Sequence, residues 1–126
     1  MPDGYDPNGE LGPFFDTAGL CRRLGVTRQA LNGRVHRNTL LGVKADDGSI
    51  LYPTWQFTPD MAVLGGLPEL LRVLDAVAPD GFSKAVWLCA PQARLGGRSA
   101  AELLAAGADL EPLLQAAQAD VDRLSH

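Results

Sequence analysis

The sequence predicts a mainly α-helical protein, in which a winged helix-turn-helix with a small β-hairpin is followed by a helical domain. Three observations indicate this fold class. Two short amphipathic segments flank a glycine between residues 14 and 38, alternating apolar residues surround the turn sequence DDGS, and leucines recur at helical spacing from residue 67 onward. We divide the chain into a flexible N-terminal arm (1–13), a winged helix-turn-helix (14–58) and a helical domain (59–126).

The overall composition is that of a small globular chain. It has 126 residues, of which 46% are apolar, and a formal net charge of −4. No apolar run approaches the roughly 20 residues of a membrane span, and no basic, apolar leader opens the chain, so we expect a cytoplasmic protein without membrane contact. The two cysteines form no CxxC pair, which favours reduced thiols.

The first 13 residues, MPDGYDPNGELGP, are rich in glycine and proline and show no apolar periodicity. This composition predicts a flexible arm. The arm carries acidic residues, so it does not suit a tail that enters the minor groove of DNA.

The segment FFDTAGLCRRLGVTRQALNGRVHRN predicts two helices joined by a tight turn. Asp16 or Thr17 caps the first helix, Gly25 supplies the turn, and Thr27 caps the second helix. The inward positions of the second helix are Ala30, Leu31 and Val35.

A β-hairpin is expected directly after the second helix. Leu41, Val43 and Ala45 alternate with Gly42 and Lys44, and ILYP forms the returning strand after the DDGS turn. Helices follow in GGLPELLRVLDAVAP, SKAVWLCA, SAAELLAAG and LEPLLQAAQADVDRLS, and the expected apolar stripe of the last helix is Leu110, Leu113, Leu114, Ala117, Val121 and Leu124.

Charge is distributed unevenly along the chain. Residues 17–45 hold six basic residues and no acid, whereas residues 59–126 hold five basic and nine acidic residues. A local basic field of this kind is typical of a nucleic-acid-binding surface, even in a chain that is acidic overall. The alternative is an ordinary helical hairpin with a solvated basic face.

A helix-turn-helix presents the first turns of its second helix to base edges in the major groove. Arginine pairs with guanine, and glutamine and asparagine pair with adenine, through two hydrogen bonds each. The residues expected at base edges are Thr27, Arg28, Gln29 and Asn32. The residues expected at phosphates are Arg34, His36, Arg37 and Lys44, and the hairpin acts as the wing.

The stretch RRLGVTRQALNGRVHRNTLLGVKADDGSILYP resembles the winged helix-turn-helix of the MerR and excisionase type. That pattern consists of a Leu-Gly-Val-Ser/Thr-Arg turn, a recognition helix and a two-stranded wing. Gly33 departs from it, because a glycine inside a helix costs about 1 kcal/mol relative to alanine. We expect this glycine to allow close approach to DNA.

Reactive groups do not converge in the sequence. His36 and His126 lack partners at metal-ligand spacing, Cys21 is expected to be a small apolar residue at the edge of the core, and no Walker or dinucleotide-binding loop is present. Asp46 and Asp47 belong to the hairpin turn, and the second acidic pair, at 120 and 122, is expected on a solvated helix face. We therefore expect no enzyme activity, no bound metal and no cofactor.

The stretch ARLGGRSAAELL looks at first like a phosphate-binding loop. It lacks the Walker lysine, and Ser99 with Glu102 forms the pattern of a capping box at the start of a helix. We interpret it as a turn between two helices.

The longer stretch VWLCAPQARLGGRSAAELL resembles the Xre/MbcA/ParS toxin-binding antitoxin domain over roughly residues 65–124. Ala100 departs from the proline usual in that domain. The matching positions are Trp87, Leu88, Pro91, Leu95, Gly96, Gly97, Arg98, Ser99, Leu103 and Leu104.

This resemblance implies an antitoxin of a type II toxin-antitoxin system. Its helical domain would occlude the active site of a cognate toxin, expected to be a RES-type enzyme that consumes NAD⁺, and its front half would repress the shared promoter by binding operator DNA. A homodimer and a larger toxin-antitoxin complex are implied. The residues expected at the toxin are Arg98, Glu111, Leu114, Gln118, Val121, Asp122 and Leu124.

Three alternatives remain at this point. The last helix would simply close the core without binding a partner. The chain would be a stand-alone MerR-like or excisionase-like regulator with a helical dimerisation tail. The back half would be a pure protein-interaction module whose front half no longer binds DNA.

Overall fold

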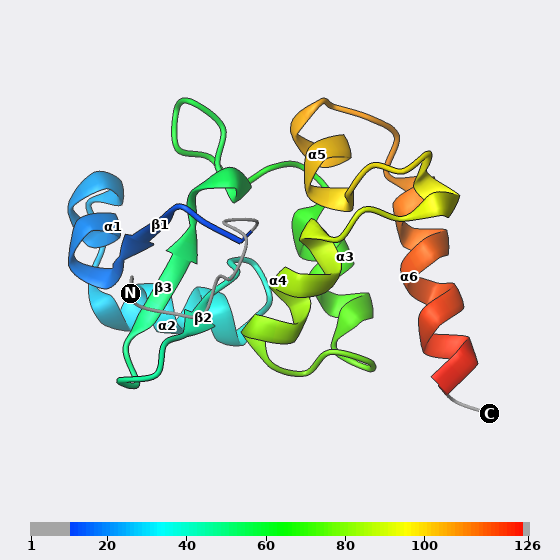
Figure 1. The fold of residues 1–126 in the computed structure, drawn as a ribbon. Coiled ribbons are helices and arrows are strands. Elements are labelled where there is room, and N and C mark those ends of the chain that lie inside the picture. Colours follow the sequence, from blue (N-terminus) through cyan, green and yellow to red (C-terminus); the bar gives the residue numbers. More distant parts are fainter. Residues whose placement is uncertain (1–10, 125–126) are drawn as a thin grey trace.

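The computed structural model describes residues 11–124 and confirms a mainly α-helical fold with a small antiparallel sheet (Figure 1). In chain order the elements are β1 (Phe14–Asp16), α1 (Thr17–Leu24), α2 (Arg28–His36), β2 (Val43–Lys44), β3 (Ile50–Pro53), η1 (Thr54–Gln56), α3 (Leu67–Leu74), α4 (Gly81–Cys89), η2 (Ala93–Leu95), α5 (Ala100–Ala105) and α6 (Glu111–Leu124). None of the helices among the described residues is long and apolar enough to cross a membrane.

The helix-turn-helix is held by the side chains that the sequence indicated. The carboxylate of Asp16 accepts a hydrogen bond from the backbone N–H of Gly19 at 2.6 Å, so Asp16 rather than Thr17 caps α1. The hydroxyl of Thr27 accepts from the N–H of Ala30 at 3.1 Å and caps α2. Gly25 ends α1 with φ of 67°, a left-handed conformation that favours glycine.

The sheet contains one strand that the sequence did not predict. Its order is β1–β3–β2, with Phe15 opposite Tyr52 and Val43 opposite Leu51. The sequence predicted a helix capped at Asp16 or Thr17 and no strand before it, but Phe14–Asp16 pairs with β3.

The end of the predicted arm is packed against the fold. Residues 1–10 lie outside the described residues, but Leu11 is buried and the carbonyl of Pro13 accepts a hydrogen bond from the N–H of Thr54 at 3.0 Å. Leu11 and Pro13, which we assigned to the N-terminal arm, therefore contact the folded part of the chain.

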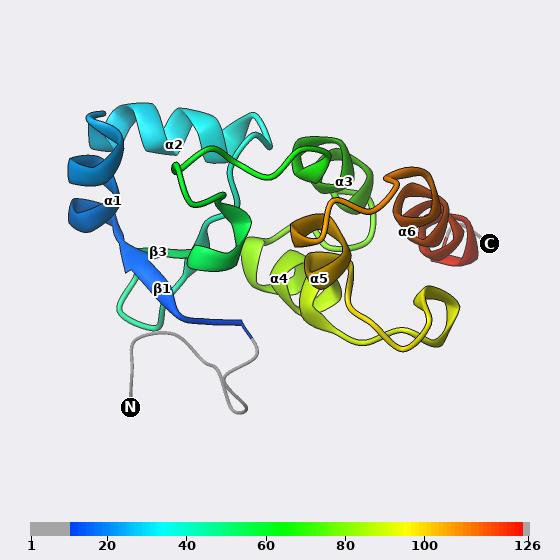
Figure 2. The ribbon, with the colours of Figure 1, turned by 90° about the horizontal axis from the view of Figure 1, so that it is seen from above.

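The apolar core does not divide where the front and back halves were separated in sequence. A small cluster inside the front half consists of Leu20, Leu31, Leu40 and Tyr52. The larger cluster joins Leu41 and Val43 of the hairpin region to the leucines of α3, α4, α5 and α6. Figure 2 shows the arrangement, with α1 and α2 at one end, α6 at the other, and α3, α4 and α5 between them.

The helical back half follows the predicted stripes in part. Leu67, Leu70, Leu71 and Leu74 of α3 are buried, as the leucine spacing indicated. In α6 the buried residues are Leu113, Ala116, Ala117 and Asp120, so the buried face is rotated from the expected one. The capping box is confirmed, since the Ser99 hydroxyl accepts from the Glu102 N–H and the Glu102 carboxylate accepts from the Ser99 N–H, both at 3.1 Å.

Candidate nucleic-acid interface

The outer face of α2 is formed by polar side chains. Arg28, Gln29 and Asn32 are exposed, while Leu31 of the same helix is completely buried. The buried side fixes the helix against α1 and β3, so the three polar residues project from a supported surface. Thr27 is also exposed, but its hydroxyl is engaged as the cap of the helix.

Helix α2 and the hairpin expected to act as the wing share one hollow. Its volume is about 380 Å³, and Arg28 and Asn32 of α2 line one side of it. The rest of its lining is Asp16, Thr17 and Ala18 at the start of α1 and Gly48, Ser49 and Ile50 at the wing. The structure therefore brings two of the expected base-contacting residues next to the turn of the hairpin.

The residues expected at phosphates lie near the far end of α2 and on β2. His36, Arg37 and Lys44 are exposed, and Arg34 is half-buried. A Cβ atom on Gly33 would lie 3.0 Å from a guanidinium nitrogen of Arg37. The absence of a side chain at Gly33 thus leaves room for the guanidinium of Arg37 beside the helix.

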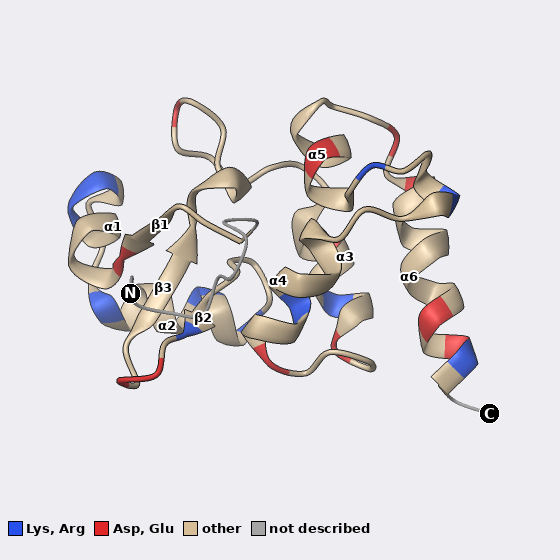
Figure 3. Ribbon diagram, in the orientation of Figure 1, with Lys and Arg blue, Asp and Glu red and all other residues tan. Residues whose placement is uncertain are grey.

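The wing carries charge of both signs. Figure 3 shows basic residues along α1, α2 and β2 and acidic residues at the turn of the hairpin. Asp46 and Asp47 are exposed there, and the carboxylate of Asp47 accepts hydrogen bonds from the N–H and hydroxyl of Ser49 at 2.9 and 2.6 Å. These bonds lower the pKa of Asp47 further below its ordinary value. The wing would therefore meet a phosphate backbone through Lys44 and not through its tip.

The residues expected at a toxin lie on more than one surface. Glu111, Gln118 and Asp122 are exposed on one side of α6. Leu124 lies on the opposite side, because each residue turns a helix by about 100°, and its exposed fraction is 67%. Of the others, Leu114 and Val121 are half-buried, and Arg98 is exposed in the turn before α5.

Arg98 does not form a phosphate-binding loop. Its guanidinium lies 3.9 Å from the carboxylate of Glu102, and Gly96 and Gly97 before it both have positive φ, which fits a reversal between helices. The Ser99 bonds lower the pKa of Glu102, so the capping carboxylate is ionised at neutral pH. The interpretation of this segment as a helix-to-helix turn is confirmed.

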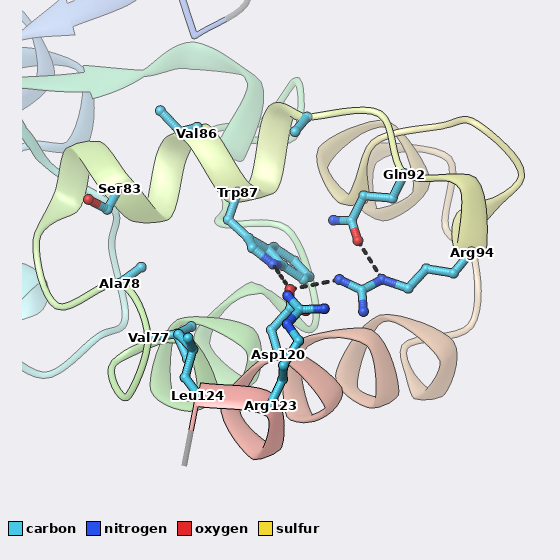
Figure 4. Close-up of a pocket in the computed structure, with 11 residues that line it drawn as sticks. Val77, Ala78, Ser83, Val86, Trp87, Gln92, Arg94, Asp120, Arg123 and Leu124 are labelled. Atoms are coloured by element: carbon cyan, nitrogen blue, oxygen red, sulfur yellow. Dashed lines mark hydrogen bonds and ion pairs between the residues drawn. The ribbon is translucent and has the colours of Figure 1, made fainter. Parts of the chain in front are cut away.

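A groove between α4 and α6 was not expected from the sequence. Its volume is about 440 Å³, and Val86 and Leu124, the two large apolar residues that are exposed in the described part of the chain, both line it. At its floor, the carboxylate of Asp120 accepts hydrogen bonds from Trp87 Nε1 and Arg94 at 2.7 Å each and from Arg123 at 2.5 Å (Figure 4).

Asp120 corrects the expectation that both acids of its pair lie on a solvated helix face. Its exposed fraction is only 7%. Burial alone would raise the pKa of Asp120, but the hydrogen bonds from Arg94 and Trp87 and the neighbouring guanidinium charges outweigh burial and lower it. The signal was present in the spacing, because residue 120 follows Leu113, Ala116 and Ala117 on one helix face.

The comparisons with known proteins bear on the fold. No protein-family model matches the chain, and no curated protein matches it. The chain is similar to a solved structure described as "NMR structure of Rv2175c", with 23% sequence identity, a TM-score of 0.74, and coverage of 96% of this chain and 89% of the other. This similarity shows a shared fold across nearly the whole length.

Proposed function

We propose that the protein binds duplex DNA through α2 and the wing and acts in the cytoplasm as a regulator of transcription. The observation that carries this proposal is the exposure of Arg28, Gln29 and Asn32 on α2, with Arg28 and Asn32 sharing one hollow with the wing. These side-chain types pair with guanine and adenine edges in the major groove.

The dimensions of α2 fit this role. The helix has nine residues, which corresponds to a length of about 14 Å, comparable to the roughly 12 Å width of the major groove. Its first turns carry the residues for base edges, while His36, Arg37 and Lys44 are exposed where a backbone would pass. Because phosphate contacts release counterions, affinity would fall steeply with salt.

The first experiment replaces Arg28 and Asn32 with alanine. We expect at least a tenfold loss of affinity for a duplex carrying the upstream region of the protein's own gene, because each two-bond contact contributes about 1–3 kcal/mol. Fluorescence anisotropy measures the affinity, and circular dichroism checks the fold.

The matched control is the double variant Arg98→Ala and Gln118→Ala, which removes one exposed guanidinium and one exposed amide from the back half. It should bind DNA like the wild-type chain. Equal affinity of all three proteins would reject α2 as the recognition helix.

A second candidate function is neutralisation of a protein partner, as an antitoxin. The observation that favours it is the groove between α4 and α6, where Val86 and Leu124 leave apolar surface exposed. Exposed apolar surface rimmed by polar groups is typical of protein interaction sites. We propose that a RES-type toxin encoded by a neighbouring gene binds here, and that the chain acts as a homodimer within a larger complex.

Co-expression with the product of the adjacent gene tests this second function. Co-purification of the two chains, together with relief of the partner's toxicity, would support it. Retained toxicity without a complex would leave the stand-alone regulator as the correct assignment.

A further inference from the structure

The end of the recognition helix is tied to the back half by three polar side chains. Asn38 follows α2, and its amide donates a hydrogen bond to one carboxylate oxygen of Asp75 at 2.6 Å. The other oxygen of Asp75 lies 2.6 Å from the ammonium nitrogen of Lys84, which also donates to the carbonyl of Pro79 at 3.2 Å. A continuous path therefore runs from α2 to α4.

The burial of Lys84 fixes the orientation of the Asp75 carboxylate. The side chain of Lys84 is only 7% exposed, and a buried ammonium is stable only when it is paired. Lys84 thus holds Asp75 in place and leaves the second oxygen of Asp75 directed at Asn38. The backbone of Asn38 has φ of 60°, a conformation that asparagine tolerates better than most residues.

The base of the wing rests on the same part of the back half. A Cβ atom on Gly81 would lie 1.7 Å from the carbonyl oxygen of Gly42, so the start of α4 touches the chain just before β2. The connection between α3 and α4 therefore contacts both the end of α2 and the base of the wing.

We propose that Asn38, Asp75 and Lys84 are positioning residues for DNA binding, which fix α2 relative to the wing without touching DNA. This inference rests on the proposed DNA-binding function. It assigns the back half a direct part in DNA binding, since a change at the α3–α4 connection alters the pose of the recognition helix.

The main test is Asn38→Gly. Glycine accepts a φ of 60° without strain, so this variant removes only the amide. We expect its dissociation constant for the duplex of the upstream region to rise about three- to tenfold, as for the loss of one solvent-exposed hydrogen bond, with little change in the thermal midpoint.

The matched control is Gln118→Ala. It removes an amide-to-carboxylate hydrogen bond of the same kind, 3.0 Å long, between Gln118 and Asp122 on α6. Its affinity for DNA should equal that of the wild-type chain.

A charge swap separates positioning from simple electrostatics. Asn38→Asp places two carboxylates against each other and should weaken DNA binding. Asn38→Asp combined with Asp75→Asn restores an amide-to-carboxylate pair with the wild-type net charge, and Lys84 keeps two acceptors, the new amide oxygen at position 75 and the carbonyl of Pro79. Recovery of affinity in the double variant is expected. If the new negative charge near α2 were the cause of weaker binding, both variants would be equally weak, and the inference would be overturned.

Hydrogen–deuterium exchange of α2 without DNA supplies an independent readout. Exchange should accelerate in Asn38→Gly and in Asn38→Asp and return towards the wild-type rate in the swap. Faster exchange with unchanged DNA affinity would show that the linkage stabilises α2 without positioning it, and unchanged exchange and affinity would reject the linkage altogether. If the wild-type chain itself binds no duplex, the proposed function fails, and exchange alone then decides whether the linkage holds the helix.

Discussion

At the scale of single residues, Asp120 is a charged side chain in a position that helical spacing assigns to the core. Its carboxylate has three donors, from Trp87, Arg94 and Arg123. Ionised acceptors form stronger hydrogen bonds than neutral ones, so this arrangement ties α4 and η2 to α6. Asp122, two residues further on, is exposed and bonds only to a neighbour on its own helix.

We predict that Asp120→Asn lowers the free energy of unfolding by about 2 kcal/mol at pH 7, because it weakens hydrogen bonds to a buried charge. Asp122→Asn is the control and should change it by less than about 0.5 kcal/mol. Urea denaturation measures both. Equal effects of the two substitutions would contradict the assignment of Asp120 as a buried anchor.

The lowered pKa of Asp120 also predicts how its contribution to stability depends on pH. The pKa of Asp120 lies below its ordinary value of 3.8, so its contribution to stability is complete above about pH 3.8 and is lost as pH falls through the lower folded-state pKa. The difference between wild-type and Asp120→Asn proteins should therefore shrink below pH 3.8. A difference that stays constant down to pH 2 would rule out the ionised carboxylate as its source.

At the scale of elements, the sequence was most informative where a local interaction decides the structure. The caps at Asp16, Thr27 and Ser99 and the turn at Gly25 depend on neighbouring residues, and all were predictable. The strand at Phe14–Asp16 was not, because its formation depends on the distant edge of β3 and three residues carry no periodicity.

In the candidate site too, features that depend on neighbouring residues were predictable and contacts between distant segments were not. The exposure of Arg28 and Asn32 followed from helical spacing, and the basic character of the front half followed from its composition. Other features of the site are contacts between segments that are distant in sequence. These are the wing tip beside Arg28 and Asn32, the hydrogen bond from Asn38 to Asp75, and the packing of the base of the wing against Gly81. No pattern within either segment encodes such a contact.

The contact between α4 and the chain before β2 gives a prediction in which two effects have opposite signs. Alanine is a better helix former than glycine, so propensity alone predicts that Gly81→Ala stabilises the protein. Packing predicts the opposite, because the new Cβ would lie 1.7 Å from a backbone oxygen. We expect destabilisation of about 3 kcal/mol in urea denaturation.

Gly65→Ala is the control for this substitution, since a Cβ atom there meets nothing within 4 Å. It should leave the urea midpoint unchanged or raise it slightly. A stable Gly81→Ala protein would mean that α4 does not rest on the base of the wing.

At the scale of the whole molecule, the larger of the two buried clusters spans both halves. Leu41 and Val43 of the front half belong to the same buried cluster as Leu113 of α6, although α6 lies at the opposite end of the molecule (Figure 1). The front half therefore depends on α3 and α4, and α3 in turn packs against α6. The front half also has a small buried cluster of its own, formed by Leu20, Leu31, Leu40 and Tyr52, but its hairpin is anchored in the larger cluster.

This shared core predicts the result of removing α6 by ending the chain after Asp109. The truncation deletes Leu113, Ala116 and Ala117 from the core, and a single large-to-small substitution in a core already costs about 2–5 kcal/mol. That loss is comparable to the whole stability of a small domain, so the wing should unfold together with α3 and α4. The truncated chain should lose both its helical circular dichroism signal and its affinity for DNA. In the full-length variant Leu113→Ala, these two properties should be lost at the same urea concentration, as expected of one cooperative unit. A truncated chain that keeps the helix signal of α1 and α2 and the wild-type affinity for DNA would show instead that the recognition helix and wing fold without the back half.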